Sequence, residues 1–284
     1  EYIILNSRLE VIQYEDYTLS VKITGNTIPK KIYLNINNSI FKLTSLGNNK
    51  FEHTFQHINT DLTFNFSGGG YNSEYYTIKT LFQPKVVSLE SRITHPKYTE
   101  KKIEIIKNNG DLLISEGSFI NWKIKLQNIN NTSFLIDDII INKSPNDYIE
   151  VKKQIFKNCN YTIISSNEND LIDTLSYLIK VISDEHPIIE VEQSYDSISK
   201  KHLFQGMISD DYKLRKLEFI YEYEDIDKNE QTISEEIKII GANLEKLFFS
   251  INFEELGALI ENDVKYYFKV WDNDEINGSK FTKS

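Results

Sequence analysis

The chain has 284 residues, of which 40% are hydrophobic and 26% charged, and its formal net charge is −10 at pH 7. This composition is typical of a folded globular chain, and the negative charge argues against nucleic acid as a partner because it repels phosphate backbones. The single cysteine, Cys159, excludes an internal disulfide and a cysteine-based zinc site.

The sequence contains neither a signal peptide nor an apolar run of about 18 residues, the length that spans a bilayer. It begins with Glu1, and its only methionine is Met207. Both features indicate a segment of a longer protein. We therefore expect any leader or membrane anchor to lie upstream of this segment.

Segments in which apolar and polar residues alternate follow one another along the whole chain. Four clear examples are residues 17–23, 31–36, 119–126 and 216–223. A period of two is typical of a strand with one face buried, and the Asn, Gly, Ser and Asp clusters between such segments are typical of the turns of a sandwich or barrel. Residues 243–257 fit a helix, or a strand followed by a turn, equally well. The pattern predicts an all-β fold.

One short motif recurs three times, as Tyr76-Thr-Ile-Lys-Thr, Tyr177-Leu-Ile-Lys-Val and Tyr266-Tyr-Phe-Lys-Val. The copies lie roughly 100 residues apart, the length of an immunoglobulin-like sandwich. Pro84 and Pro187 follow the first two copies and stand where a new strand starts, a position that tolerates the missing N–H of proline. We interpret each copy as the last strand of a module. The prediction is three tandem immunoglobulin-like (Ig-like) β-sandwich modules at residues 1–84, 85–185 and 186–284.

Acidic residues cluster near the predicted second joint, which residues 183–187 form. Asp184 and Glu185 lie in the joint itself, and Asp210 and Asp211 follow the first long strand of the third module. If these four meet, their carboxylates form a candidate calcium site, since Ca²⁺ takes six to eight oxygen ligands. Solvated turns are the alternative, because Asp favours turns for its own backbone contacts. Residues 271–279, with two further Asp, suggest a similar feature at the next joint.

Other motifs point away from catalysis. His53 and His57 have a spacing that suits zinc on a helix, but their segment is predicted to be a strand running into a turn. The Gly68-Gly-Gly run lacks the ending of a phosphate-binding loop and predicts a hairpin or bulge. No nucleophile elbow is present. Trp122 and Trp271 are predicted to fill the sandwich cores, with a sugar-stacking platform as the alternative.

Five phrases, taken in order along the chain, resemble the domain-of-unknown-function family 4175. They occupy residues 15–25, 96–101, 109–122, 209–217 and 271–280. The resemblance implies a large envelope protein of Bacteroidetes-type bacteria, with an N-terminal membrane anchor, β-sandwich modules outside the cytoplasm and a long helical C-terminal region. It implies no catalytic residues. Glu100 and Lys213 stand where that family usually has Gly, so a left-handed turn at Lys213 would be strained or the turn must differ.

Together these features predict a non-enzymatic, extracytoplasmic Ig-like array that acts as a spacer or protein-interaction scaffold of a membrane-anchored envelope protein. Protein partners or self-association are expected, with no nucleic acid, no direct membrane contact by this segment and no cofactor apart from the calcium of Asp184, Glu185, Asp210 and Asp211. A carbohydrate-binding module array and a calcium-dependent adhesin are the alternatives.

Overall fold

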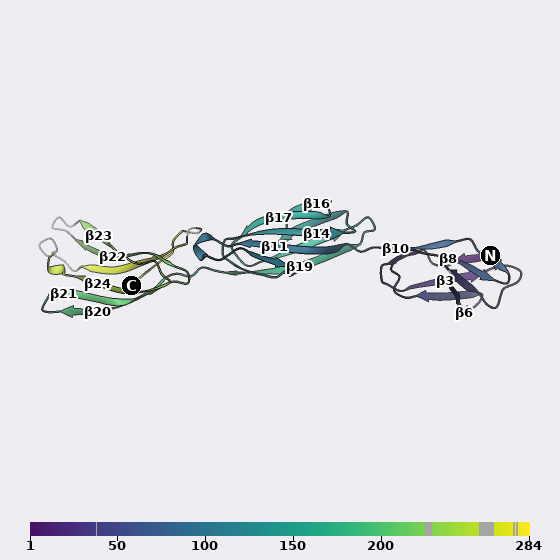
Figure 1. Cartoon of the computed structure of the whole chain (residues 1–284), viewed down its shortest axis with the longest axis horizontal. Coiled ribbons are helices and arrows are strands. Elements are labelled where there is room, and N and C mark those ends of the chain that lie inside the picture. Colours follow the sequence, from purple (N-terminus) through teal and green to yellow (C-terminus); the bar gives the residue numbers. More distant parts are fainter. Residues whose placement is uncertain (38, 225–228, 256–263, 275, 277) are drawn as a thin grey trace. The chain divides into compact units, whose positions relative to one another are not determined.

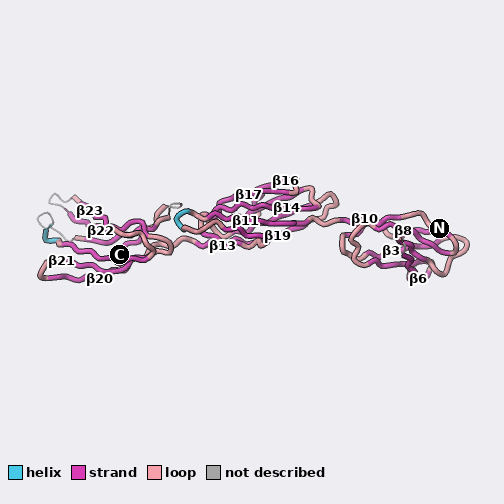
Figure 2. Tube along the Cα trace, viewed as in Figure 1, coloured by secondary structure: helices cyan, strands magenta, loops and turns pink. Residues whose placement is uncertain are grey.

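The computed structural model describes the chain except residues 38, 225–228, 256–263, 275 and 277. Its described part is built from strands, with two short helical turns, η1 (Lys97–Thr99) and η2 (Phe253–Glu255) (Figure 2). Six sheets pair into three β-sandwiches, which confirms the predicted fold class (Figure 1). The ambiguous stretch from residue 243 is the strand β24 (Leu244–Ile251) followed by η2; residues 256 and 257 lie outside the described residues.

The first sandwich has one four-stranded sheet and one larger sheet. The smaller sheet has the order β1 (Tyr2–Ile4), β3 (Tyr17–Ile23), β7 (Lys50–Phe55), β6 (Thr44–Gly47). The larger has the order β2 (Glu10–Ile12), β10 (Tyr76–Leu81), β8 (Leu62–Gly68), β4 (Tyr33–Ile36), β5 (Ser39–Lys42), with β9 (Tyr71–Asn72) on β8. The last strand, β10, pairs in parallel with the early strand β2.

The second sandwich repeats this plan. One sheet has the order β12 (Glu104–Lys107), β11 (Lys85–Thr94), β14 (Ser118–Gln127), β17 (Tyr148–Ile155). The other has the order β13 (Leu112–Ser115), β19 (Ile172–Ile182), β18 (Cys159–Ser166), β15 (Asn131–Ile136), β16 (Ile139–Ser144). Again the last strand, β19, runs parallel to an early strand, β13. The first two copies of the tyrosine motif therefore lie on last strands, as predicted.

The third sandwich departs from this plan. One sheet has the order β20 (Ile188–Asp196), β21 (Lys201–Ser209), β24. The other has the order β23 (Glu230–Ile237), β22 (Leu214–Glu224), β25 (Lys265–Asp272), β26 (Phe281–Lys283). The third motif copy lies on β25, and β26 follows it and pairs with it antiparallel. Its assignment as a last strand was wrong, because a tyrosine, an apolar residue and a lysine in alternation mark any half-buried strand and not its place in the topology.

The hydrophobic cores of the sandwiches follow from the alternation of apolar and polar residues along the strands. Along β14, every second side chain is buried, and Trp122 is fully enclosed with its ring 5.3 Å from that of Tyr161. Burial of such a large side chain contributes about 1.5–3 kcal/mol or more. The prediction for Trp122 is confirmed. Trp271 instead lies on the face of β25 opposite to the buried Phe268 and Val270 and is half-buried, so its assignment to the core was wrong.

The triple glycine forms a tight hairpin between β8 and β9. Gly68 pairs with Tyr71, and Gly69 and Gly70 between them have φ values of +61° and +84°. Two consecutive positive φ angles are what a two-residue hairpin turn with the correct twist requires, so the predicted hairpin is confirmed.

The strands of the three sandwiches draw on residues 2–81, 85–182 and 188–283, and the finer module boundaries stay predictions. The chain also divides into two compact units. The first contains Glu1–Ser88, Ile124–Ile149 and Thr162–Leu175, and the second contains Leu89–Lys123, Glu150–Tyr161 and Ser176–Ser284. Across the described residues, no helix has the length and apolar character needed to cross a bilayer.

Candidate functional site

The second compact unit contains a buried group of carboxylates. Asp184 follows β19, and its side chain is only 1% exposed. The Nζ of Lys280 contacts the Oδ2 of Asp184 and donates a hydrogen bond of 2.8 Å to its main-chain carbonyl. The N–H of Asp184 donates to Glu116 Oε2 at 3.4 Å. Asp184 is therefore not a solvated turn residue but a buried partner of a lysine 96 residues away in the chain.

Asp210 and Asp211 follow β21 and lie in the electrostatic range of Asp184. Burial raises the pKa of Asp210 to about 6, the N–H of Tyr212 opposes the shift with a 3.0 Å hydrogen bond, and the charges of Asp211 and Asp184 add to it. Burial also raises the pKa of Asp211, again with Asp184 adding to the shift.

Three of the four predicted residues, Asp184, Asp210 and Asp211, lie within electrostatic range of one another. Glu185 is exposed and donates its backbone N–H to Asp211. Among the residues that the structure describes, no three His, Cys, Asp or Glu side chains are already arranged to hold a metal ion. The calcium assignment thus stays a prediction.

Two further carboxylates complete the group. Asp272 is fully buried and Asp274 is 1% exposed. Asp272 Oδ1 accepts hydrogen bonds from the N–H groups of Lys280 at 2.8 Å and Asp274 at 3.2 Å. Burial raises the pKa of Asp272 to about 6, and the charges of Asp184 and Asp210 contribute to the shift.

Placing residues 271–279 at the next joint was wrong for Asp272 and Asp274; residues 275 and 277 lie outside the described residues. Strand β25 runs antiparallel to β22 and pairs Asp272 with Leu214. The end of β25 therefore returns to the loop that carries Asp210 and Asp211. Reading the third tyrosine motif as a penultimate strand is the signal that would have placed Asp272 and Asp274 correctly.

The carboxylate group has more oxygens than partners. Four buried oxygens accept no hydrogen bond, namely Asp184 Oδ1, Asp210 Oδ1, Asp272 Oδ2 and Asp274 Oδ2. The Lys280 ammonium lies 3.9 Å from Asp274 Oδ2. Burial lowers the pKa of Lys280, but the hydrogen bond and charge of Asp184 and the charges of Asp274 and Asp272 outweigh this and raise it. Lys280 is therefore a firmly charged ammonium set among several carboxylates.

Around this group, residues 96–101 contact residues 212–213 and 273. The rings of Tyr98 and Tyr212 pack edge-to-face with centroids 5.4 Å apart, a favoured aromatic geometry. Asn273 Nδ2 donates to the Tyr98 carbonyl at 3.2 Å. Burial raises the pKa of Tyr98, with Asp184 and Asp274 adding to the shift. These contacts join the second sandwich to the third within one compact unit.

The two departures from the resembled family pair with each other. Lys213 Nζ lies 2.5 Å from Glu100 Oε1. Glu100 has a φ of +53° at the end of η1, whereas the φ of Lys213 is not positive. The turn at Lys213 thus differs from a left-handed one, and the left-handed residue is Glu100. The ion pair is largely exposed, so its contribution is about 0–1 kcal/mol.

The remaining motifs are structural. His53 lies on β7, and His57 follows in a turn with a φ of +49°, so the predicted strand and turn are confirmed.

Lysine ammonium groups lie over aromatic rings of β25 and β26. Lys269 Nζ lies 4.4 Å from the Trp271 ring and 3.8 Å from the Phe281 ring. Ammonium groups over these faces are cation–π contacts and leave less bare ring for a sugar.

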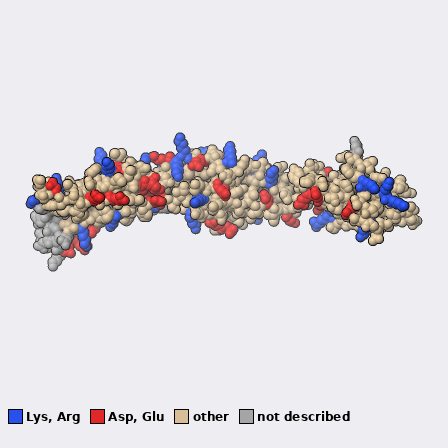
Figure 3. Space-filling model, turned by 90° about the horizontal axis from the view of Figure 1, so that it is seen from below, with Lys and Arg blue, Asp and Glu red and all other residues tan. Residues whose placement is uncertain are grey.

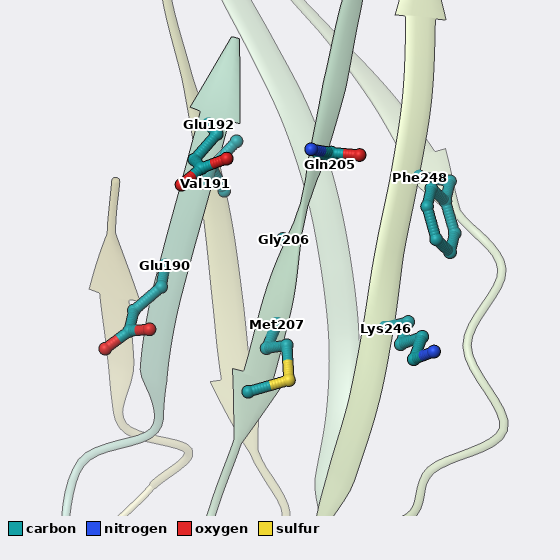
Figure 4. A pocket seen from close by; sticks show the side chains of 8 residues that line it. All are labelled: Glu190, Val191, Glu192, Gln205, Gly206, Met207, Lys246 and Phe248. Carbon is teal, nitrogen blue, oxygen red and sulfur yellow. The ribbon is translucent and has the colours of Figure 1, made fainter.

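A shallow hollow lies on the three-stranded sheet of the third sandwich (Figure 4). Its lining comes from β20, β21 and β24 and includes Glu190, Gly206, Met207, Lys246 and Phe248. Figure 4 shows side chains that arise from three neighbouring strands without converging on one point. Catalysis and tight ligand binding need convergent groups, so the carboxylate group is the better candidate site.

Charged side chains are dispersed over the face of the molecule that Figure 3 shows. On the face in Figure 3, Lys and Arg lie scattered among Asp and Glu and form no extended basic patch. The expectation that nucleic acid is not a partner stays a prediction from the net charge.

Comparison with known proteins adds only weak structural likenesses. No family model matches the chain, so the resemblance to family 4175 has no support from that comparison, and no curated protein matches either. A three-domain I-band fragment of titin aligns over 99% of this chain and 96% of its own, with 11% identity and a TM-score of 0.42. A Ca²⁺-stabilised adhesin of an Antarctic bacterium aligns over 99% of this chain and 71% of its own, with 9% identity and a TM-score of 0.39.

Fibronectin(III)-like modules of Clostridium thermocellum CbhA align over 64% of this chain and 95% of their own, with 13% identity and a TM-score of 0.30. These values are low. The sheet topology shows an array of tandem β-sandwiches, and these likenesses carry no argument about its role.

Proposed function

We propose that the chain is a non-enzymatic, extracytoplasmic spacer or protein-interaction scaffold, part of a membrane-anchored bacterial envelope protein. Its modules would occupy residues 1–84, 85–185 and 186–284. Its action would be geometric: joints of restricted motion hold the modules, and exposed edges or loops present surfaces to protein partners or to further copies of the chain.

The set of contacts around Asp184 supports this proposal most directly. A flexible tether needs no buried contacts, yet Asp184 is buried, pairs with Lys280, and lies beside the Tyr98–Tyr212 ring pair. Ordering these side chains costs conformational entropy. Packing and ion pairing that hold the joint in one geometry would offset this entropy cost.

The carbohydrate-binding alternative has weaker support. It needs a row of exposed aromatic rings, but two rings of β25 have lysine ammonium groups over them: Lys269 over Trp271 and Lys283 over Tyr267, the latter at 4.2 Å. The calcium-dependent adhesin alternative gains support from the buried carboxylate oxygens without hydrogen-bond partners.

Distances between spin labels test the restricted joint in the full chain. Lys123→Cys on β14 and Ser234→Cys on β23 place labels at exposed positions, and the native Cys159 is buried. We expect one narrow distance distribution in the labelled parent chain. Pro187→Gly combined with Asp184→Ala should broaden it without unfolding the modules, because the change removes the rigid proline and the buried ion pair together.

A Gly-Ser insertion between Glu185 and His186 provides the freely jointed reference. A parent distribution as broad as that reference would contradict the proposal. So would a small-angle scattering profile and a distance distribution that are both unchanged in the double variant.

A further inference from the structure

The Lys280 side chain meets Asp184 at an enclosed position of the second compact unit. Its Nζ contacts Asp184 Oδ2 and donates a 2.8 Å hydrogen bond to the Asp184 carbonyl. The side chain of Asp184 is 1% exposed and that of Lys280 is 19% exposed. Asp184 Oδ1 accepts no hydrogen bond from the described residues. An amine nitrogen, which is a nucleophile when neutral, therefore lies beside a carboxyl group that is almost shielded from water.

Main-chain hydrogen bonds hold both partners in place. The N–H of Lys280 donates to Asp272 Oδ1 at 2.8 Å, and the N–H of Asp272 donates to the Lys280 carbonyl at 3.1 Å. The N–H of Asp184 donates to Glu116 Oε2 at 3.4 Å. Two reacting groups that are fixed in this way react as if their concentration were about 10⁵–10⁸ M.

Asp274 provides a base beside the same amine. Its side chain is fully buried, and its Oδ2 lies 3.9 Å from Lys280 Nζ. This oxygen accepts no hydrogen bond from the described residues. A carboxylate in this position can take a proton from an attacking amine and return it to a leaving group, and such distances often shorten only in the reacting arrangement.

We propose that Lys280 and Asp184 form an isopeptide bond, an intramolecular amide between Lys280 Nζ and Asp184 Cγ, with release of one water molecule. One ammonium proton first passes to Asp184 Oδ2, which gives a neutral amine and a carboxylic acid. The lone pair of the amine then attacks Cγ, and the C–N bond forms. Asp274 takes the second proton from the nitrogen and gives it to the Asp184 hydroxyl, which leaves as water when the C–O bond breaks.

No further reactant is required, because the ammonium and the carboxylate contain every atom of the amide and the water. The ion pair in this structure is the arrangement before reaction. The charges of Asp184, Asp274 and Asp272 favour the ammonium, so the neutral amine is a minor form and the reaction is slow. A bond that forms once in each chain tolerates a slow step.

The surroundings favour the amide once it has formed. Two buried charges become one neutral group, which removes the cost of keeping both charges away from water. Exclusion of water from the site also slows hydrolysis. The bond would tie the end of β19 to the segment before β26, 96 residues further along the chain. This modification does not depend on the proposed spacer role.

Mass spectrometry of the intact, denatured full chain tests the bond directly. We expect a mass that is lower than the sequence mass by one water molecule. Digestion should then yield a branched peptide that joins the segments around Asp184 and Lys280. The peptide map is required because cyclisation of the N-terminal Glu1 also releases water.

Two variants and one matched control complete the design. Lys280→Arg keeps a positive charge beside Asp184 but removes the nucleophilic amine, so this chain should keep its full sequence mass. Asp274→Asn keeps the side-chain shape but removes the base, so the linked fraction should grow at least about tenfold more slowly after refolding. Lys213→Arg alters an exposed lysine–carboxylate pair and should link as the parent does. Thermal unfolding shows whether each variant is folded.

A parent chain that keeps its full sequence mass after prolonged incubation in native buffer would overturn the proposal, whether or not the variants fold. A water loss that persists in Lys280→Arg would also overturn it, as would a peptide map that places the loss elsewhere. Linkage of Asp274→Asn at the parent rate would remove Asp274 from the reaction. The spin-label distances that test the spacer role are a separate measurement, so the two proposals can fail independently.

Discussion

Burial changes the pKa values of aspartates around Lys280. Asp272 and Asp210 each have a pKa raised to about 6, first by burial and then by neighbouring carboxylates. Such shifts are unfavourable for the ionised form. Ionised Asp272 and Asp210 therefore stabilise the fold less at neutral pH than their protonated forms do at lower pH.

The pH dependence of stability follows from these shifts. Folding raises the pKa of Asp272 from 3.8 to about 6, so the folded chain holds this proton more tightly than the unfolded chain. The stabilisation is fully present below about pH 4 and is lost as the pH rises through about 6. In EDTA, Asp272 should lower the free energy of unfolding by about 1 kcal/mol between pH 5 and pH 7.

Denaturant unfolding at pH 5, 6 and 7, compared between the parent and Asp272→Asn, measures this contribution. The difference between the two chains isolates Asp272 from carboxylates whose pKa values shift the other way, such as Asp196. A difference that stays constant over this range would contradict the assignment.

Glu100 offers a second test at the residue scale. Its φ of +53° is unfavourable for any residue with a Cβ and favourable for Gly. Glu100→Gly and Glu100→Ala both lose the exposed ion pair with Lys213, but only Gly relieves the backbone. We expect the Gly variant to be more stable than the Ala variant by about 1 kcal/mol, measured by thermal unfolding. Equal stabilities would show that the left-handed backbone at this position carries no cost.

At the scale of elements, the strand order decides which loops meet. The first two sandwiches end in strands that pair in parallel with an early strand, β10 with β2 and β19 with β13. The third sandwich ends instead with β25 and β26 as an antiparallel pair. This change of plan brings Asp272 and Asp274 back toward Asp210.

Strand β20 depends on a close backbone approach to β21. A Cβ at Gly206 would overlap the main-chain carbonyl of Glu190, the residue before its cross-strand partner Val191. Gly206→Ala must therefore displace β20 and should destabilise the third sandwich by about 1–3 kcal/mol. Gln205→Ala, an exposed neighbour on β21, is the matched control and should change stability by less than about 0.5 kcal/mol.

Scanning calorimetry of the full chain distinguishes these two variants. The expected result is a transition displaced to lower temperature by several degrees in Gly206→Ala alone. Equal transitions in the two variants would mean that β20 tolerates the added methyl group without moving.

At the scale of the whole molecule, the described contacts differ between the two predicted joints. Near residues 82–84, Asn167 Nδ2 donates to the Phe82 carbonyl at 2.7 Å and Asn128 Nδ2 donates to the Gln83 carbonyl at 3.2 Å. Near residues 183–187, a buried ion pair and a tyrosine pair add to such bonds. The contacts described near residues 183–187 therefore include buried charge that a change of pH alters, whereas the two contacts described near residues 82–84 join uncharged groups.

Much of the local structure could be predicted from the sequence. The alternating segments form strands, Trp122 fills a core, the triple glycine makes a hairpin and the two prolines stand before new strands. Each of these features depends on residues that are close together in the sequence, within about one strand or turn. Side-chain alternation and turn preference are local properties of the backbone.

The candidate site could be predicted only in part. The sequence predicts Asp184 because it lies in the joint and Asp210 because it follows the first long strand of the third module. Asp272, Asp274 and Lys280 reach the same region through the pairing of β25 with β22 and the return into β26. An alternating pattern identifies a strand without identifying its partner. Partner choice depends on how two sheets close over a shared core, and that long-range packing alone decided which carboxylates became buried together.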